Sequence, residues 1–245
     1  PFDEAQIKQY LQQVFGNRNS DQLYDTLKSI HNLAELAERP VLLNFLVEII
    51  DDLEALVLSN QKITTASVYD RVVHKSFDRD KFKHEIPVEI KEIVLEEIAC
   101  FLWKRADRRV SFSKLAKFLS EFLANGSAAM KKLYFQKEEE ALYKDLRNAT
   151  LLVRSDEKDF GFSHTSVQEY FLARYLINKI QLQEYKNLDV DLISPETIQF
   201  CVDLIVQMPF GDLQEVNKGI SEGFEIGDVL CRKILFDIVL ADAQR

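Results

Sequence analysis

The sequence predicts a mainly helical protein with one small β-hairpin, on three observations. Only seven glycines and five prolines occur in 245 residues, too few for an all-β protein with many tight turns. Apolar residues recur at helical spacing along most of the chain. The spacing changes to two over a short stretch near residues 150–164, which indicates strands.

Residues 1–85 are expected to form a helical domain of the four-helix type. Asp3 can cap a first helix, which Gly16 ends, since short polar side chains bind free backbone N–H groups and glycine terminates helices. A second helix is expected around residues 23–33, where leucines and Ile30 repeat at helical spacing.

A third helix is expected over "AERPVLLNFLVEIIDDLEAL", with Pro40 at its first helical position, where a missing N–H costs nothing. Its buried face would include Leu43 and Leu53. A fourth helix should follow, with Thr64 or Thr65 as its cap.

Residues 86–181 combine three helices with the hairpin. The expected helices are "PVEIKEIVLEEIACFLWKR", "VSFSKLAKFLSEFLANG" and "KEEEALYKDLRN", and the hairpin joins "TLLVRSD" to "FGFSH". Three helices followed by a hairpin predict a winged-helix domain. Residues 182–245 are expected to begin a second helical domain, with amphipathic helices in "SPETIQFCVDLIVQM" and "GDVLCRKILFDIVLADA".

The composition of the chain limits the kinds of partner that it can bind. The formal charge of −9 opposes nucleic-acid binding, and no stretch of 18 or more apolar residues suggests a membrane span. Cys100, Cys201 and Cys231 are widely spaced in apolar surroundings, as expected of reduced core thiols in a cytoplasmic protein. Because the chain starts at Pro1 without an initiator methionine, we expect a fragment of a longer protein.

No catalytic or metal site is predicted. The glycines of "GISEGFEIG" lack the lysine and hydroxyl residue of a phosphate loop. Asp51 and Asp52 sit in a helical pattern and not at the end of a magnesium-binding strand. His31, His74 and His84 have no partner at metal-ligand spacing.

His164 is the candidate binding residue. It precedes "TSVQ", in which Thr165 and Gln168 predict a capping box at the start of a helix. A helix N-terminus attracts anions, and a histidine there can donate a further hydrogen bond to a phosphate oxygen. A histidine that simply ends a strand is the alternative interpretation.

The run "GFSHTSVQEYFLARYL" resembles the hallmark of the winged-helix domain in NACHT-type signalling NTPases of the STAND class. The matching residues are Phe162, His164, Gln168, Glu169, Tyr170 and Phe171. "LAERPVLLNFLVEII" is similar to the helix of that family whose proline abuts the adenine base. The resemblance covers about residues 1–181.

The resemblance implies a nucleotide-controlled switch. His164 would contact the β-phosphate of ADP, Pro40 would lie beside the adenine, and exchange for ATP would open the protein for homo-oligomerisation and effector activation. Magnesium and the catalytic motifs would come from an upstream nucleotide-binding domain, and a sensor domain would follow. The chain alone should neither hydrolyse ATP nor hold ADP or ATP tightly, whereas the full-length parent would be an ATPase with a role in prokaryotic defence.

Two other classes remain open. One is a winged-helix DNA-binding transcription regulator, and the other is a helical adaptor. The expected third helix of the winged-helix domain, "KEEEALYKDLRN", carries three consecutive glutamates, which phosphates would repel.

Overall fold

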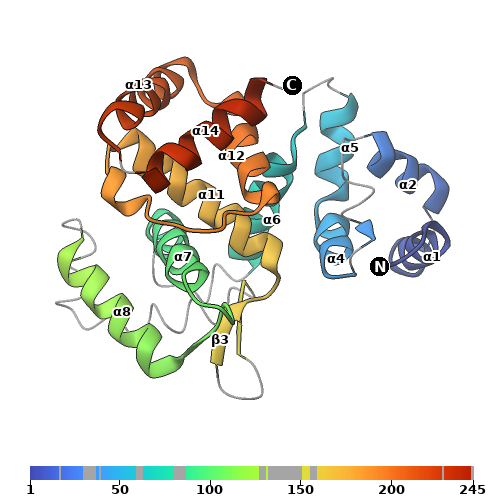
Figure 1. Cartoon of the computed structure of the whole chain (residues 1–245). Helices are drawn as coiled ribbons and strands as arrows, with labels where there is room; N and C mark the ends of the chain where they lie inside the picture. The colour runs from blue at the N-terminus through green and yellow to red at the C-terminus, as the bar shows by residue number, and fades with distance from the viewer. Residues whose placement is uncertain are drawn as a thin grey trace. The chain divides into compact units, whose positions relative to one another are not determined.

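The computed structural model of the chain describes residues 1–16, 18–29, 37–38, 40–58, 63–79, 87–126, 131, 151–154, 159–227 and 229–243. These residues form helices and one small antiparallel sheet, so the mainly helical class is confirmed (Figure 1). The chain divides into two compact units, Pro1–Asp78 and Arg79–Arg245. The expected division at residues 85 and 181 stays a prediction.

The first unit is helical throughout its described residues. Its helices are α1 (Glu4–Phe15), α2 (Ser20–Ser29), α4 (Pro40–Glu48), α5 (Ile50–Leu58) and α6 (Thr65–Arg79). A capping box between Asp3 and Gln6 starts α1, and Gly16 follows its last residue, as predicted. Pro40 is the first residue of α4, and Thr64 accepts a hydrogen bond from the Ser67 backbone N–H at the start of α6.

The predicted single helix after Pro40 is wrong in one respect, because it is two helices with a break at Ile49. The Ile49 N–H donates to the Leu46 carbonyl at 3.2 Å, a tight turn of the i to i+3 kind. The break buries both Ile49 and Ile50, which are neighbours in sequence and are each 1% exposed. Apolar spacing cannot reveal such a break when the same buried face continues on both sides.

The second unit contains the sheet and most of the long helices. In order it has α7 (Val88–Trp103), β1 (Val110–Ser111), α8 (Phe112–Asn125), β2 (Leu152–Arg154), β3 (Asp159–Phe162), α11 (Thr165–Gln181), η2 (Tyr185–Asn187), α12 (Pro195–Gln207), α13 (Phe210–Ile226) and α14 (Val229–Ala243). The predicted hairpin is confirmed as the antiparallel pair β2 and β3. β1 pairs with the other edge of β3, giving the strand order β1-β3-β2. β1 has only two residues, which is too short for an alternating pattern of apolar and polar residues to be recognised in the sequence.

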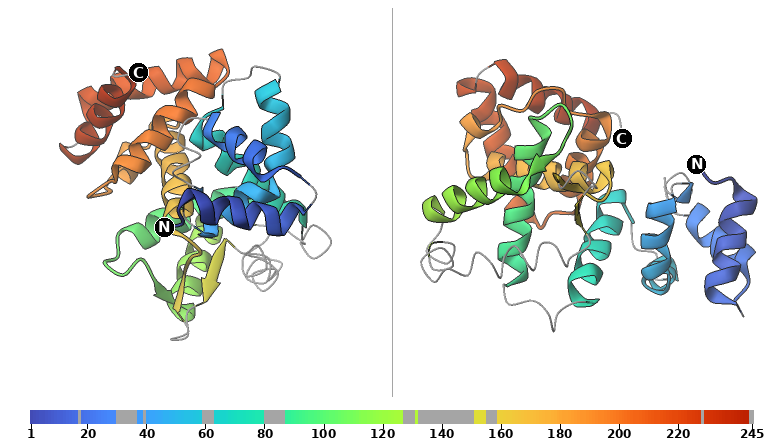
Figure 2. Two further views of the ribbon diagram at one scale, coloured as in Figure 1. Left: turned by 90° about the vertical axis from the view of Figure 1, so that its right-hand side faces the viewer. Right: turned by 90° about the horizontal axis from the view of Figure 1, so that it is seen from below.

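The helix that follows the hairpin, α11, is the centre of this unit. It packs against α7, α12 and α13, and Figure 2 shows it in yellow to orange among them. Tyr170, Leu172 and Leu176 are fully buried on it. Because α11 is covered on several sides, the position of its first residue is fixed by the whole unit.

The sequence analysis predicted no helix over α13, which contains three glycines. The structure explains two of them, Gly219 and Gly223, by close packing. A Cβ atom at Gly219 would lie 2.2 Å from the backbone oxygen of Ile180 in α11. The Tyr185 hydroxyl donates to the Gly219 carbonyl at 2.9 Å. Glycine therefore serves here to let two helices approach closely.

Two further predictions concern composition. Cys100, Cys201 and Cys231 are buried free thiols, as expected. Among the described residues, no helix combines the length and the apolar character that crossing a membrane requires.

Candidate functional site at the start of helix α11

The candidate site begins where β3 turns into α11. The Ser163 backbone N–H donates to the Leu151 carbonyl at 2.8 Å, which extends the hairpin pairing beyond Phe162. His164 then has an extended backbone, with φ −149° and ψ 148°, and α11 starts at the next residue. His164 is half-buried.

The His164 ring itself caps the helix. Its Nδ1 accepts a hydrogen bond from the Ser166 backbone N–H at 3.2 Å and lies 2.6 Å from the Ser166 hydroxyl oxygen. Where Nδ1 accepts from this N–H, the neutral ring carries its hydrogen on Nε2. The cap thereby favours the tautomer whose donor is Nε2.

The predicted capping box of Thr165 and Gln168 is wrong. Thr165 is already helical and exposed. The Gln168 amide, which is buried, donates to the Ala99 carbonyl of α7 at 3.2 Å. The sequence rule failed because a histidine can also cap a helix, and because the glutamine has a tertiary partner.

The aromatic residues of the run belong to the core. Tyr170 stacks edge-on against Phe171 and Phe200, with ring centroids 5.4 and 5.7 Å apart, and Phe162 lies 5.9 Å from Phe171. Gln168, Glu169 and these aromatic residues are buried. Of the six residues that carry the resemblance, His164 is half-buried and the other five are buried.

Ion pairs hold α11 on α7. The Arg174 guanidinium binds both oxygens of Glu92 at 3.1 Å and Glu96 Oε1 at 2.9 Å. The Lys179 ammonium lies 3.0 Å from Glu97. Burial raises the pKa of Glu96, and the nearby Arg174 charge opposes that shift without cancelling it.

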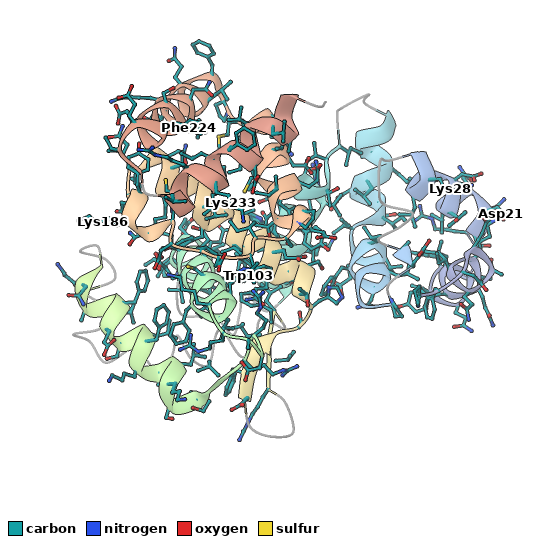
Figure 3. All side chains as sticks on the ribbon, viewed as in Figure 1. Asp21, Lys28, Trp103, Lys186, Phe224 and Lys233 are labelled. Carbon is teal, nitrogen blue, oxygen red and sulfur yellow. The ribbon has the colours of Figure 1, made fainter. Side chains whose placement is uncertain are left out.

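A cationic turn, residues 104–109, packs beside β3. A Cβ atom at Gly161 would lie 3.2 Å from the Arg108 backbone oxygen, so glycine allows this approach. The Arg108 guanidinium stacks 3.4 Å from the ring centroid of Trp103, which Figure 3 labels at the end of α7. The turn carries Lys104, Arg105, Arg108 and Arg109 against one acid, Asp107.

The buried guanidinium of Arg108 is only partly compensated by neighbouring polar and charged groups. Its Nη1 atom is buried and has no hydrogen-bond partner among the residues that the structure describes. Burial lowers the pKa of Arg108, and the charge of Glu169 in α11 partly opposes this. We did not predict this residue from the sequence, although the basic run "KRADRR" before a strand is a visible signal.

Pro40, the other predicted contact, is exposed at the start of α4 in the first unit. His164 belongs to the second unit. A joint contact of the two residues with one nucleotide therefore stays a prediction.

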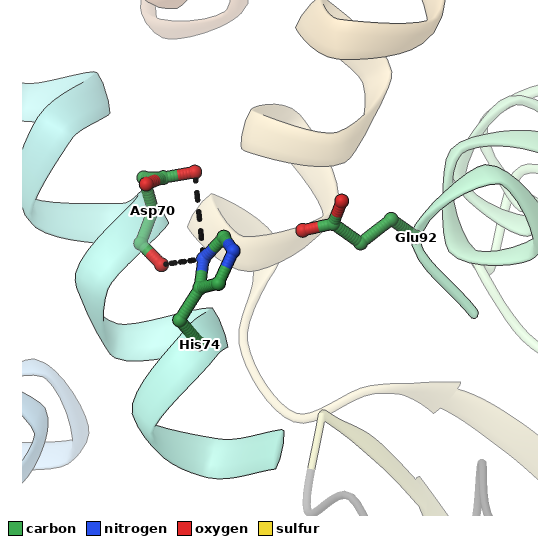
Figure 4. Close-up of side chains that lie close together, drawn as sticks. All are labelled: Asp70, His74 and Glu92. Atoms are coloured by element: carbon green, nitrogen blue, oxygen red, sulfur yellow. Dashed lines mark hydrogen bonds and ion pairs between the residues drawn. The ribbon is translucent and has the colours of Figure 1, made fainter. Parts of the chain in front are cut away.

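His74 has a local partner. Its Nδ1 lies 2.9 Å from the Asp70 backbone oxygen, to which it can donate, and 3.6 Å from the Asp70 carboxylate, one turn earlier on α6 (Figure 4). Glu92, also drawn in Figure 4, belongs to the other unit and was described with Arg174 above. Among the described residues of the first unit, this cluster offers only His74 and Asp70, which are too few ligands for a metal site.

Some predictions fall on residues outside the described ranges. They are the helix over residues 137–148, Glu157 and Lys158 of the predicted hairpin turn "EKD", and the environments of His31 and His84.

Neither a model of a known protein family nor a curated protein matches this chain.

Proposed function

We propose that this chain is the regulatory helical and winged-helix segment of a NACHT-like signalling NTPase, and that His164 contacts a phosphate of bound ADP. The observation that carries the proposal is the state of the His164 ring. The ring is half-buried and its Nδ1 accepts from the Ser166 N–H, an arrangement that leaves the hydrogen of the neutral ring on Nε2. An Nε2–H at a helix N-terminus suits a phosphate oxygen, because the helix dipole also favours negative charge there.

The cationic turn supports the same role. Its backbone packs against Gly161, three residues before His164. The Arg108 guanidinium has an unsatisfied buried N–H, so an anion nearby would lower its energy. Arg108 and Arg109 are thus the residues that we add to the proposed phosphate environment.

The order of elements supports the winged-helix part of the proposal. α7, β1 and α8 precede the hairpin of β2 and β3, and β1 completes a three-stranded sheet. The remaining helix of the expected motif would come from residues 137–148, which the structure does not describe.

The proposed regulation follows from the thermodynamic coupling between nucleotide binding and closure of the domains. A nucleotide that contacts both this segment and a separate nucleotide-binding domain stabilises only the closed arrangement, so its exchange shifts the population. What this chain would supply is a hydrogen-bond donor at His164 and positive potential at α11. The magnesium and the phosphate loop would belong to the other domain.

The test compares His164→Asn with wild type in a protein that joins this chain to a nucleotide-binding domain. Asparagine is a good N-cap, so its Oδ1 replaces Nδ1, but no atom replaces Nε2–H. A hydrogen bond to a charged group contributes about 1.5–3 kcal/mol, so ADP should dissociate roughly ten- to hundredfold faster. Stopped-flow release of a fluorescent ADP analogue measures this.

His74→Asn is the matched control, since His74 is an exposed histidine on α6. Its ADP release should equal that of wild type. Equal release rates in His164→Asn and wild type would contradict the phosphate contact and leave His164 as a helix cap.

A further inference from the structure

The helix α14 has two apolar faces, and only one of them is covered. Cys231, Ile234, Leu235 and Ile238 are at most 2% exposed and form the face that packs within the unit. This face contacts α12 and α13. Four residues at this spacing are the ordinary stripe of an amphipathic helix.

The opposite face is also apolar. Val229 is 87% exposed, Phe236 57% and Leu240 46%, and they follow one another at spacings of seven and four residues. Single exposed apolar residues are normal, but a row of them along one helix face marks an interaction surface. We call this row, with Val239 beside it, the outer face of α14.

The outer face carries two opposite charges on one flank. Lys233 and Asp237 lie one turn apart, between Val229 and Leu240, and Figure 3 labels Lys233 on this helix. No ion pair or hydrogen bond of either side chain occurs among the residues that the structure describes. Arg232, in contrast, is engaged, because it donates to the carbonyls of Gly227 and Glu225.

This arrangement is self-complementary. If a second α14 lies antiparallel on the first, related by a two-fold axis through the contact, each flank faces the same flank of the other copy. Val229 then meets Leu240 of the second copy, and the two Phe236 rings lie near the axis. Lys233 meets Asp237 of the second copy, twice by symmetry.

We propose that the outer face of α14 binds a second copy of this chain and forms a two-fold symmetric dimer. The charge pattern favours this occupant. The apolar row would accept any apolar helix, whereas in the antiparallel self-pairing Lys233 of each copy also meets Asp237 of the other. The contact needs no nucleotide and does not involve His164, so it is independent of the proposed switch.

Sedimentation velocity of the whole chain over a range of concentrations tests the dimer. Wild type should show a reversible monomer–dimer equilibrium without larger species. Phe236→Glu should be monomeric and should keep the wild-type circular dichroism spectrum, since Phe236 is 57% exposed. Val14→Glu, at an apolar residue of α1 that is 47% exposed, is the matched control and should dimerise like wild type.

Charge reversal distinguishes this pairing from general apolar association. Lys233→Asp and Asp237→Lys should each weaken the dimer by about three- to tenfold, because each places like charges together at two symmetric positions. The double reversal K233D/D237K should restore the dimer, since it exchanges the charges. A monomeric wild type, open-ended oligomers, or single reversals without effect would each overturn the proposal, and a monomer would assign the face to a different protein.

Discussion

At the scale of single residues, His164 has two roles that must be separated. Its Nδ1 caps α11, and its Nε2 carries the hydrogen of the proposed phosphate contact. The first role is a property of the fold and is measurable without any ligand. Removing His164 therefore tests stability before it tests function.

We expect His164→Ala to lower the free energy of unfolding by about 0.5–2 kcal/mol, because the Ser166 N–H loses its acceptor. His164→Asn should stay close to wild type, since asparagine caps helices well. Urea denaturation of the three proteins measures both effects. A His164→Ala protein as stable as wild type would show that the cap contributes nothing.

At the scale of elements, α13 depends on a glycine where it crosses α11. Gly219→Ala should destabilise the protein by more than about 1 kcal/mol, because its Cβ would overlap the Ile180 carbonyl and the helices must move apart. Gly211→Ala on the same helix is the control, as nothing lies within 4 Å of its Cβ. Alanine there should be neutral or stabilise by up to about 1 kcal/mol. Thermal unfolding followed by circular dichroism compares them.

The contact of α7 with α11 should make stability depend on pH through Glu96. Burial raises the pKa of Glu96 above its ordinary value of 4.5. The contribution of Glu96 to the free energy of unfolding is therefore fully present below pH 4.5. The contribution is lost as pH rises through the raised pKa. Glu96→Gln removes this loss, so the stability of Glu96→Gln relative to wild type should increase with pH from about 4.5 upward.

Glu184 provides a control of opposite sign. The hydrogen bond from Lys179 lowers the pKa of Glu184, so its contribution is present above 4.5 and is lost as pH falls through the lowered pKa. Glu184→Gln should therefore lose stability relative to wild type at neutral pH and not in strong acid. Denaturation midpoints at a series of pH values measure the stability of each variant relative to wild type. If this difference changed with pH in the same direction for Glu96→Gln and Glu184→Gln, the two opposite pKa shifts would be contradicted.

At the scale of the whole molecule, the net charge of −9 argues against the alternative of a DNA-binding regulator. The cations of the turn at residues 104–109 are too few to reverse that field, and Lys104 is already paired with Asp189. We expect no sub-micromolar binding of duplex DNA at physiological salt. Fluorescence anisotropy with a labelled duplex measures this. Tight binding that weakens steeply with added salt would favour the transcription regulator instead.

The sequence by itself determined the features that depend only on residues close together in the chain. Asp3, Pro40 and Thr64 start helices where predicted, because caps and proline act within one turn of the chain. The hairpin was also predictable, since alternation of apolar residues is a property of the strands themselves. His164 was recognised as the candidate for the same reason, from its place between a strand and a helix.

Tertiary structure decided the rest. Gly219 of α13 and the strand β1 depend on neighbours far along the chain, which periodicity does not encode. The partner of Gln168 and the burial of Arg108 follow from the packing of α7 and β3 around α11. A capping pattern states which side chains could bind the free N–H groups of a helix. Only the packed structure shows that the His164 ring binds one of them, while the Gln168 amide donates to the Ala99 carbonyl of α7 in the interior.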